Sequence, residues 1–131
     1  MALLLPLAAG AAELSEVGDA RAGEALYATF CATCHGREAD GRGPTAEVMV
    51  LPPPDLTGLL MRNDGVFPIA RVVAQIDGRD PLMAHGGPMP PFGQVFEGED
   101  TLLKTATGEP LLTSRPVADL VAWLRSVQAR P

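Results

Sequence analysis

The chain has 131 residues, a length that suits one small domain with a single hydrophobic core. Its formal net charge is −6 and Lys104 is its only lysine. The sequence therefore excludes a nucleic-acid-binding protein, which needs a basic face, and favours docking on basic or neutral protein surfaces.

Residues 1–12 are apolar and small, and this run is too short to span a bilayer. It is typical of the apolar region and cleavage site of a secretory signal, with a cut after Ala11 or Ala12, but it lacks the usual basic residues before it. An ordinary apolar tail is the alternative. We expect a signal peptide at 1–12, a single domain at 13–131, export to the periplasm and no membrane span in the mature chain.

The stretch from Asp19 to the first cysteine predicts a helix, with Asp19 as its N-cap. Gly23 costs roughly 1 kcal/mol inside a helix relative to alanine, which indicates a close helix crossing at this point. The apolar stripe of helical spacing consists of Ala22, Leu26, Tyr27 and Phe30.

This helix leads into the sequence C-x-x-C-H at residues 31–35, which holds both cysteines of the chain. The spacing is the attachment signature of c-type haem. Two thiols three residues apart can form thioether bonds with the vinyl groups at one porphyrin edge, and the next imidazole can then ligate the iron. The motif predicts one covalent haem c, held by Cys31 and Cys34, with His35 as an iron ligand. A buried porphyrin would also add apolar bulk to a chain with only four Phe, one Trp and one Tyr.

Two other kinds of site use a cysteine pair at this spacing. A redox-active disulfide lies at the start of a helix, which lowers the thiol pKa, whereas this pair follows a helical pattern and has no βαβ pattern around it. A structural zinc site needs about four nitrogen or sulfur ligands. Zinc would use every candidate in the chain and still lack a second close pair. The candidates are Cys31, Cys34, His35 and His85.

Residues 36–44 contain three glycines, an aspartate and a proline, and they predict a turn-rich loop. A ligating histidine usually donates its second N–H to a carbonyl or carboxylate, and a backbone carbonyl of this loop is the expected acceptor for His35. Residues 51–57 are rich in proline and therefore extended and stiff. Their apolar face, which includes Leu56, can lie on the porphyrin.

Two helices are expected next. Asp55 or Thr57 caps a short one that ends at residues 63–65, and a longer one has Pro68 in its first turn and Gly78 as its C-cap. The apolar face of the longer helix consists of Ile69, Val72, Val73 and Ile76.

The segment 85–93, H-G-G-P-M-P-P-F-G, provides the sixth ligand of the iron in our interpretation. Prolines on both sides of Met89 restrict the backbone that presents its weakly binding thioether, and the glycines let the chain pass close to the porphyrin. Met83 and His85 are the rival ligands. Met49 and Met61 are more simply explained as flexible fillers.

Segment 94–113 shows no chemistry; a short hairpin or an irregular loop is possible at 101–104 and 110–113. Ser114 or Arg115 then caps a last helix with Pro116 in its first turn, and the expected partner of this helix is the first one. Its buried stripe consists of Val117, Leu120, Val121, Leu124 and Val127.

Taken together, these motifs resemble the class I c-type cytochromes of mitochondria and bacteria. The resemblance runs from about Asp19 to Gln128 and rests on A-G-E-A-L-Y, C-A-T-C-H-G, G-R-G-P, P-P-P-D-L-T, G-P-M-P-P-F-G and D-L-V-A-W-L-R-S-V. It implies an all-α cytochrome c fold, with three to five helices around one haem and the N- and C-terminal helices crossing. It also implies that His35 and Met89 are the axial ligands and that the Pro44 carbonyl accepts the histidine N–H.

The leading functional hypothesis is a single-haem electron carrier of the periplasm, not an enzyme, that exchanges one electron with transiently docked redox proteins. One alternative is a cytochrome subunit of a larger dehydrogenase or oxidase complex. A second is a haem enzyme or gas sensor from which Met89 dissociates.

Overall fold

The computed structural model describes residues 17–79 and 89–130. Within these ranges it has four α-helices, three 3₁₀ turns and one two-stranded antiparallel sheet. The helices are α1 (Ala20–Phe30), α2 (Ala32–His35), α3 (Ile69–Asp77) and α4 (Arg115–Ser126). The 3₁₀ turns are η1 (Ala46–Val48), η2 (Leu56–Gly58) and η3 (Met61–Asn63), and the strands are β1 (Asp100–Lys104) and β2 (Pro110–Ser114).

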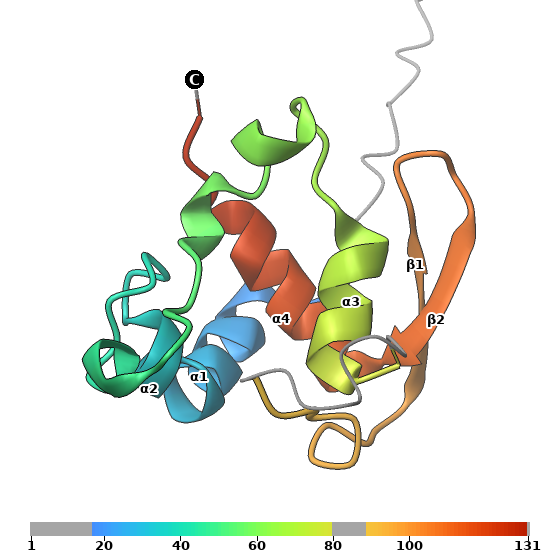
Figure 1. Cartoon of the computed structure of the whole chain (residues 1–131). Coiled ribbons are helices and arrows are strands. Elements are labelled where there is room, and N and C mark those ends of the chain that lie inside the picture. The colour runs from blue at the N-terminus through green and yellow to red at the C-terminus, as the bar shows by residue number, and fades with distance from the viewer. Residues whose placement is uncertain (1–16, 80–88, 131) are drawn as a thin grey trace, which may run out of the picture.

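The first and last long helices, α1 and α4, cross at the centre of the molecule, as expected (Figure 1). Gly23 is the crossing point, because a Cβ there would overlap the backbone carbonyl of Asp119. Beyond it, Tyr27 packs on Trp123 with ring centroids 4.1 Å apart, and both side chains are buried. The glycine predicted to permit a close approach therefore does so, and an aromatic pair fills the next turn.

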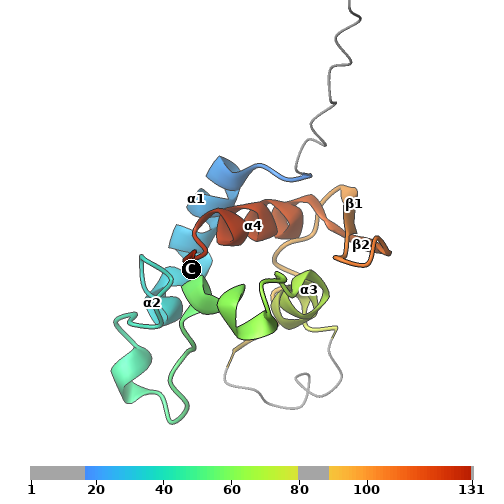
Figure 2. The same cartoon turned by 90° about the horizontal axis from the view of Figure 1, so that it is seen from above.

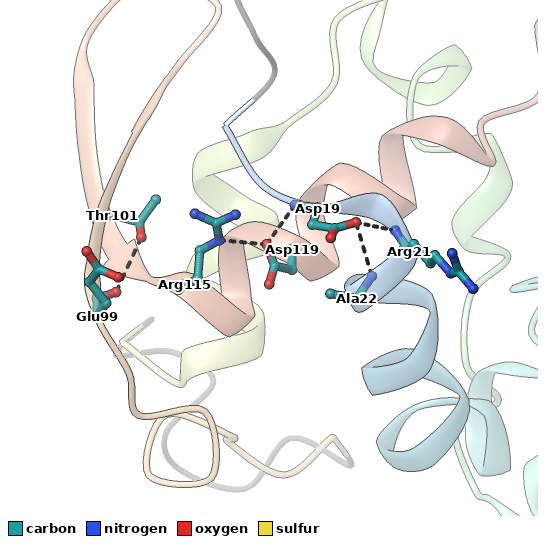
Figure 3. Close-up of polar contacts among 7 residues, drawn as sticks. All are labelled: Asp19, Arg21, Ala22, Glu99, Thr101, Arg115 and Asp119. Carbon is teal, nitrogen blue, oxygen red and sulfur yellow. Dashed lines mark hydrogen bonds and ion pairs between the residues drawn. The ribbon is translucent and has the colours of Figure 1, made fainter.

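The N-terminal end of α1 is tied to α4 by Asp119 (Figure 3). The Oδ1 atom of Asp119 accepts hydrogen bonds from the backbone N–H of Asp19 at 2.7 Å and from Nε of Arg115 at 3.0 Å. The side chain of Asp19 in turn accepts from the first free N–H groups of α1, at Arg21 and Ala22, which is the predicted N-cap. One carboxylate thus orients the entry of the chain into its first helix.

Helix α3 matches its prediction in its buried face and its C-terminal cap, whereas Pro68, expected in the first turn, precedes the helix as its N-cap. Its buried residues are Ile69, Val72, Val73 and Ile76. The helix ends at Gly78, whose φ of 78° lies in the left-handed region that glycine adopts without strain. The short helix expected before it is instead a pair of 3₁₀ turns, η2 and η3.

The expected all-α fold class is wrong, because β1 and β2 form an antiparallel hairpin between the segment after Met89 and α4. Alternating side chains explain it: Thr101, Leu103 and Thr113 are buried, whereas Leu102 and Leu112 pair on the outer face and are half-exposed. A turn closed by hydrogen bonds between Thr105 and Glu109 joins the strands. The alternating pattern of these two segments is typical of a half-buried sheet, whereas the helical spacing in the rest of the chain does not predict one.

The hairpin and α2 lie at opposite ends of the molecule, in both views (Figures 1 and 2). The crossed helices lie between them, and α3 packs against α4. Across the described ranges, no helix combines the length and apolar character that crossing a membrane requires.

Candidate haem site

The C-x-x-C-H motif forms one helical turn at the end of α1. Cys31 is the C-cap of α1, and its carbonyl accepts from the backbone N–H groups of Cys34 at 3.2 Å and His35 at 2.9 Å. Positions separated by three and four residues share one face of a helix. The two thiols and the imidazole therefore lie on the same side of this turn, as the attachment chemistry requires.

The two cysteines are free thiols in the structure. Burial raises the pKa of the Cys31 thiol to about 11, and the nearby Cys34 adds to the rise. A redox-active disulfide needs the reverse, a thiol whose pKa is lowered at a helix N-terminus. The raised pKa of Cys31 therefore disfavours a redox-active disulfide. His85, which a zinc site would need, lies outside the described residues, as does the rival ligand Met83.

The loop after His35 folds back over α2. The backbone N–H of Gly43 donates to the carbonyl of Cys34, and the Thr45 hydroxyl donates to the carbonyl of Thr33 at 2.9 Å and contacts Sγ of Cys34 at 3.3 Å. A Cβ at Gly43 would meet the carbonyl groups of Thr33 and Cys34, so glycine permits this close return. The loop therefore fixes the position of the second cysteine.

His35 is largely buried, and burial lowers the pKa of its imidazole. A backbone group of Pro54 partly offsets this shift; since proline has no N–H, that group is the carbonyl. Nδ1 is buried and lacks a hydrogen bond of full geometry in the structure. A ligating histidine needs an acceptor for its second N–H, and the Pro54 carbonyl is the candidate for that role.

The resemblance gives this role to Pro44, and that assignment stays a prediction. The backbone N–H groups of Gly43 and Thr45 donate to carbonyls of α2, so this segment runs back along α2, and Pro44 itself is exposed. Among the described residues, Nδ1 of His35 has no hydrogen-bond partner, so neither proline is distinguished by such a bond. The proline-rich segment brings Pro54 close to His35, because the N–H of Leu56 donates to the carbonyl of the fully buried Ala39 at 2.7 Å. The signal that could have found Pro54 is its place directly before the D-L-T turn.

Leu56 and Met89, the other two expected haem contacts, both pack against the main hydrophobic core and stay partly exposed. Cys31 packs against the same core. These three residues are far apart in the sequence, pack on the same core and are each partly exposed.

The backbone that follows Met89 is fastened to the end of α3. The N–H of Phe92 donates to the carbonyl of Ile76 at 2.8 Å, and added Cβ atoms at Gly78 and Gly93 would meet Pro91 and the carbonyl of Asp77. These contacts leave the segment little freedom. A weak thioether ligand needs such restriction.

Three phenylalanines join this segment to the end of α1, and sequence reasoning did not identify this cluster. Phe30 lies edge-on to Phe96 with centroids 5.2 Å apart, and Phe92 stacks on Phe96 at 5.4 Å. Because Phe30 directly precedes Cys31, the cluster couples the position of the first cysteine to that of Met89. Such aromatic contacts contribute about 0.5–1.5 kcal/mol each beyond their burial.

The donor set fits a haem. An iron porphyrin supplies four nitrogen ligands of its own and needs the remaining groups from the protein. Those groups are present here as one imidazole near a carbonyl, one thioether on a restricted segment and two thiols on one helical face. No three His, Cys, Asp or Glu side chains gather as metal ligands in ranges 17–79 and 89–130. Cys31, Cys34, His35, Leu56 and Met89 remain the predicted site residues, with Pro54 beside them.

A comparison with protein families finds one match. The family described as cytochrome c oxidase, cbb3-type, subunit III matches residues 18–104, more than half of the chain. The match includes the attachment motif and Met89 and ends with β1. No curated protein and no solved structure matches the chain.

Proposed function

Because the chain belongs to the family of cytochrome c oxidase, cbb3-type, subunit III, and is thus a class I single-haem c-type cytochrome, we propose that it is a periplasmic electron carrier with His35 and Met89 as axial ligands. The proposal names an electron-transfer protein without a catalytic residue. The observation that carries it is the fastening of the Met89 segment to α3 and to the phenylalanine cluster.

Three segments of the chain have separate roles in this function. In this proposal Cys31 and Cys34 hold the haem from one helical face, and the carbonyl of Pro54 is the candidate acceptor that orients His35. The Met89 segment restricts the sixth ligand and keeps water from that face. When bound, the haem iron supplies a one-electron redox couple, whose potential is raised by thioether ligation and burial.

A subunit role is the second candidate, and the family name favours it. In that case the same domain would pass electrons within an oxidase or dehydrogenase complex. Size-exclusion chromatography of the native protein distinguishes the two, because a carrier elutes at the mass of this chain and a subunit elutes with its partners.

The test of the ligand pair is an optical redox titration of the holoprotein and of Met89→Ala. We expect the wild-type ferric protein to be low-spin, with the weak near-infrared charge-transfer band of methionine-bound haem. Met89→Ala should lose this band and have a lower reduction potential. Met61→Ala is the matched control, because Met61 is 57% exposed on η3, and it should retain both properties.

Met89→His covers the case in which the alanine variant does not fold, since a second imidazole should restore a low-spin spectrum without the methionine band. A high-spin ferric wild type, or a band that persists in Met89→Ala, would contradict the His/Met pair. The first outcome would favour a haem enzyme or gas sensor.

A further inference from the structure

A cavity separate from the predicted haem site lies where the turn of the hairpin, the segment before α3 and the end of α4 come together (Figure 1). Its volume is about 450 Å³, within the range of about 300–1,000 Å³ that is usual for cavities that hold small molecules. None of the predicted haem-site residues is among the described residues that line it. The cavity is therefore a different feature of the fold.

The walls of this cavity are held in place by their own hydrogen bonds. Gln128, just after α4, donates through Nε2 to the carbonyls of Leu56 at 2.7 Å and Leu124 at 2.8 Å. Its Oε1 atom accepts from the backbone N–H of Leu60 at 2.9 Å. The turn of the hairpin is closed by hydrogen bonds within itself. A ligand would thus enter a cavity that is already formed, which lowers the entropy cost of binding.

The charged side chains on these walls are all cations among the described residues. Lys104 ends β1, Arg125 lies in the last turn of α4, and Arg130 follows that helix. Arg125 has an interaction of its own, so we consider only Lys104 and Arg130 as contacts for a ligand. The ion pairs between described residues include neither of these two. Like charges in one cavity repel each other, and a bound anion would offset that repulsion.

This concentration of positive charge contrasts with the rest of the chain, which has a net charge of −6. At the other end of the hairpin, a cavity of about 550 Å³ is lined by Asp77, Glu97 and Asp100. The arginine on its wall, Arg79, pairs with Asp77 at 2.6 Å. The two cavities therefore differ in sign, and only the first has the charge to attract an anion.

The remaining wall of the basic cavity is apolar. It is formed by Leu60, Val66, Phe67 and Ile69, and Val66 is 46% exposed. An inorganic anion would leave this wall in contact with water, whereas a ligand with an apolar body would cover it. Apolar walls with a few charged groups are typical of sites for organic molecules.

We propose that this cavity binds a small organic anion, whose phosphate, carboxylate or sulfonate group contacts Lys104 and Arg130 and whose apolar body lies on Val66 and Phe67. The site is independent of the proposed electron-carrier function. Much of it is formed by residues after 104, where the family match ends. Binding should weaken as the ionic strength rises, because salt screens exposed charges.

The test is calorimetric titration of the holoprotein with three probes: phenyl phosphate, inorganic phosphate and benzyl alcohol. Phenyl phosphate should bind to a single site, about tenfold or more tightly than inorganic phosphate, because it also buries an aromatic ring. Benzyl alcohol, which has the ring without the charge, should show no saturable binding at the same concentrations.

Two double variants identify the site. Lys104→Gln with Arg130→Gln removes both proposed contacts and should weaken the binding of phenyl phosphate roughly tenfold or more. The matched control is Arg21→Gln with Arg37→Gln, which removes the same charge from exposed positions outside the cavity. This control should bind within about twofold of wild type, since distant exposed charges are screened. Both variants should keep the visible spectrum and reduction potential of wild type.

Several outcomes would overturn the proposal. They are a wild type that does not bind phenyl phosphate, equal weakening in the two double variants, and equal affinity for phenyl phosphate and inorganic phosphate, which indicates an adventitious ion only. A shifted reduction potential in the Lys104 and Arg130 variant alone would show that these cations act on the haem instead. Val66→Asp covers the case in which that variant does not fold: it places a carboxylate at a half-exposed position of the cavity and should abolish binding. Unchanged binding in Val66→Asp would also contradict the site.

Discussion

Replacing Tyr27 by phenylalanine removes one hydroxyl from the contact between α1 and the end of the haem-attachment motif. This hydroxyl donates to the carbonyl of Gly36 at 2.7 Å, and the side chain is 2% exposed. The ring packs on Trp123, and phenylalanine preserves that contact. The substitution therefore isolates a single buried hydrogen bond.

The expected loss is about 1 kcal/mol in the free energy of unfolding, within the range of about 0.5–1.5 kcal/mol for one hydrogen bond. It is not larger because the Gly36 carbonyl keeps a second donor, the N–H of Ala39 at 3.2 Å. Tyr27→Ala, which also removes the ring from the core, should cost about 3–5 kcal/mol. Denaturant unfolding of the holoproteins measures both, as midpoint shifts at constant slope.

The same hydroxyl gives a pH dependence. Burial, with a smaller contribution from the charge of Asp40, raises the pKa of Tyr27 well above its ordinary value of 10.0. Because the folded form holds this proton longer than the unfolded chain, Tyr27 contributes its full stability below about pH 10 and loses it as the pH rises toward the folded pKa. Tyr27 is the only tyrosine, so phenolate absorbance reports its titration directly.

Two results would refute this reasoning. One is a phenylalanine variant as stable as wild type, because the hydrogen bond would then contribute nothing. The other is a wild type whose phenolate appears at the ordinary pKa while the protein is still folded. The alkaline decline of stability should also be smaller in Tyr27→Phe than in wild type.

The remaining predictions concern the crossing of α1 and α4. Gly23→Ala should lower the free energy of unfolding by about 1–3 kcal/mol, because its Cβ would overlap the Asp119 carbonyl. The control is Ala25→Gly on the exposed side of α1, which should cost about 1 kcal/mol. Thermal unfolding should show a lower midpoint for Gly23→Ala than for this control. Asp119→Ala should lower the free energy of unfolding by about 1–3 kcal/mol, because the N–H of Asp19 loses its acceptor. Asp119→Asn keeps an oxygen at that position and should recover most of this loss in denaturant unfolding. Equal losses in the two variants would contradict the role of Oδ1.

Several features of this protein follow from local sequence. The C-x-x-C-H spacing determines the attachment chemistry because it places two thiols and an imidazole on one helical turn. The face of α3, the N-cap at Asp19 and the close approach at Gly23 also follow from helical spacing and the properties of single residues. Such features depend on neighbours within a turn or two, and these are visible in a sequence.

Only the tertiary structure determines the contacts between segments that are far apart in the sequence. The approach of Pro54 to His35 depends on a hydrogen bond from the N–H of Leu56 to the carbonyl of Ala39, which sets how the intervening loop returns. The hairpin is a sheet because β1 and β2 pair with each other and bury one face on the core, and neither strand is stable alone. The phenylalanine cluster and the fastening of the Met89 segment are likewise contacts between distant residues. The attachment motif is thus a property of the sequence, and the pocket around it is a property of the packing.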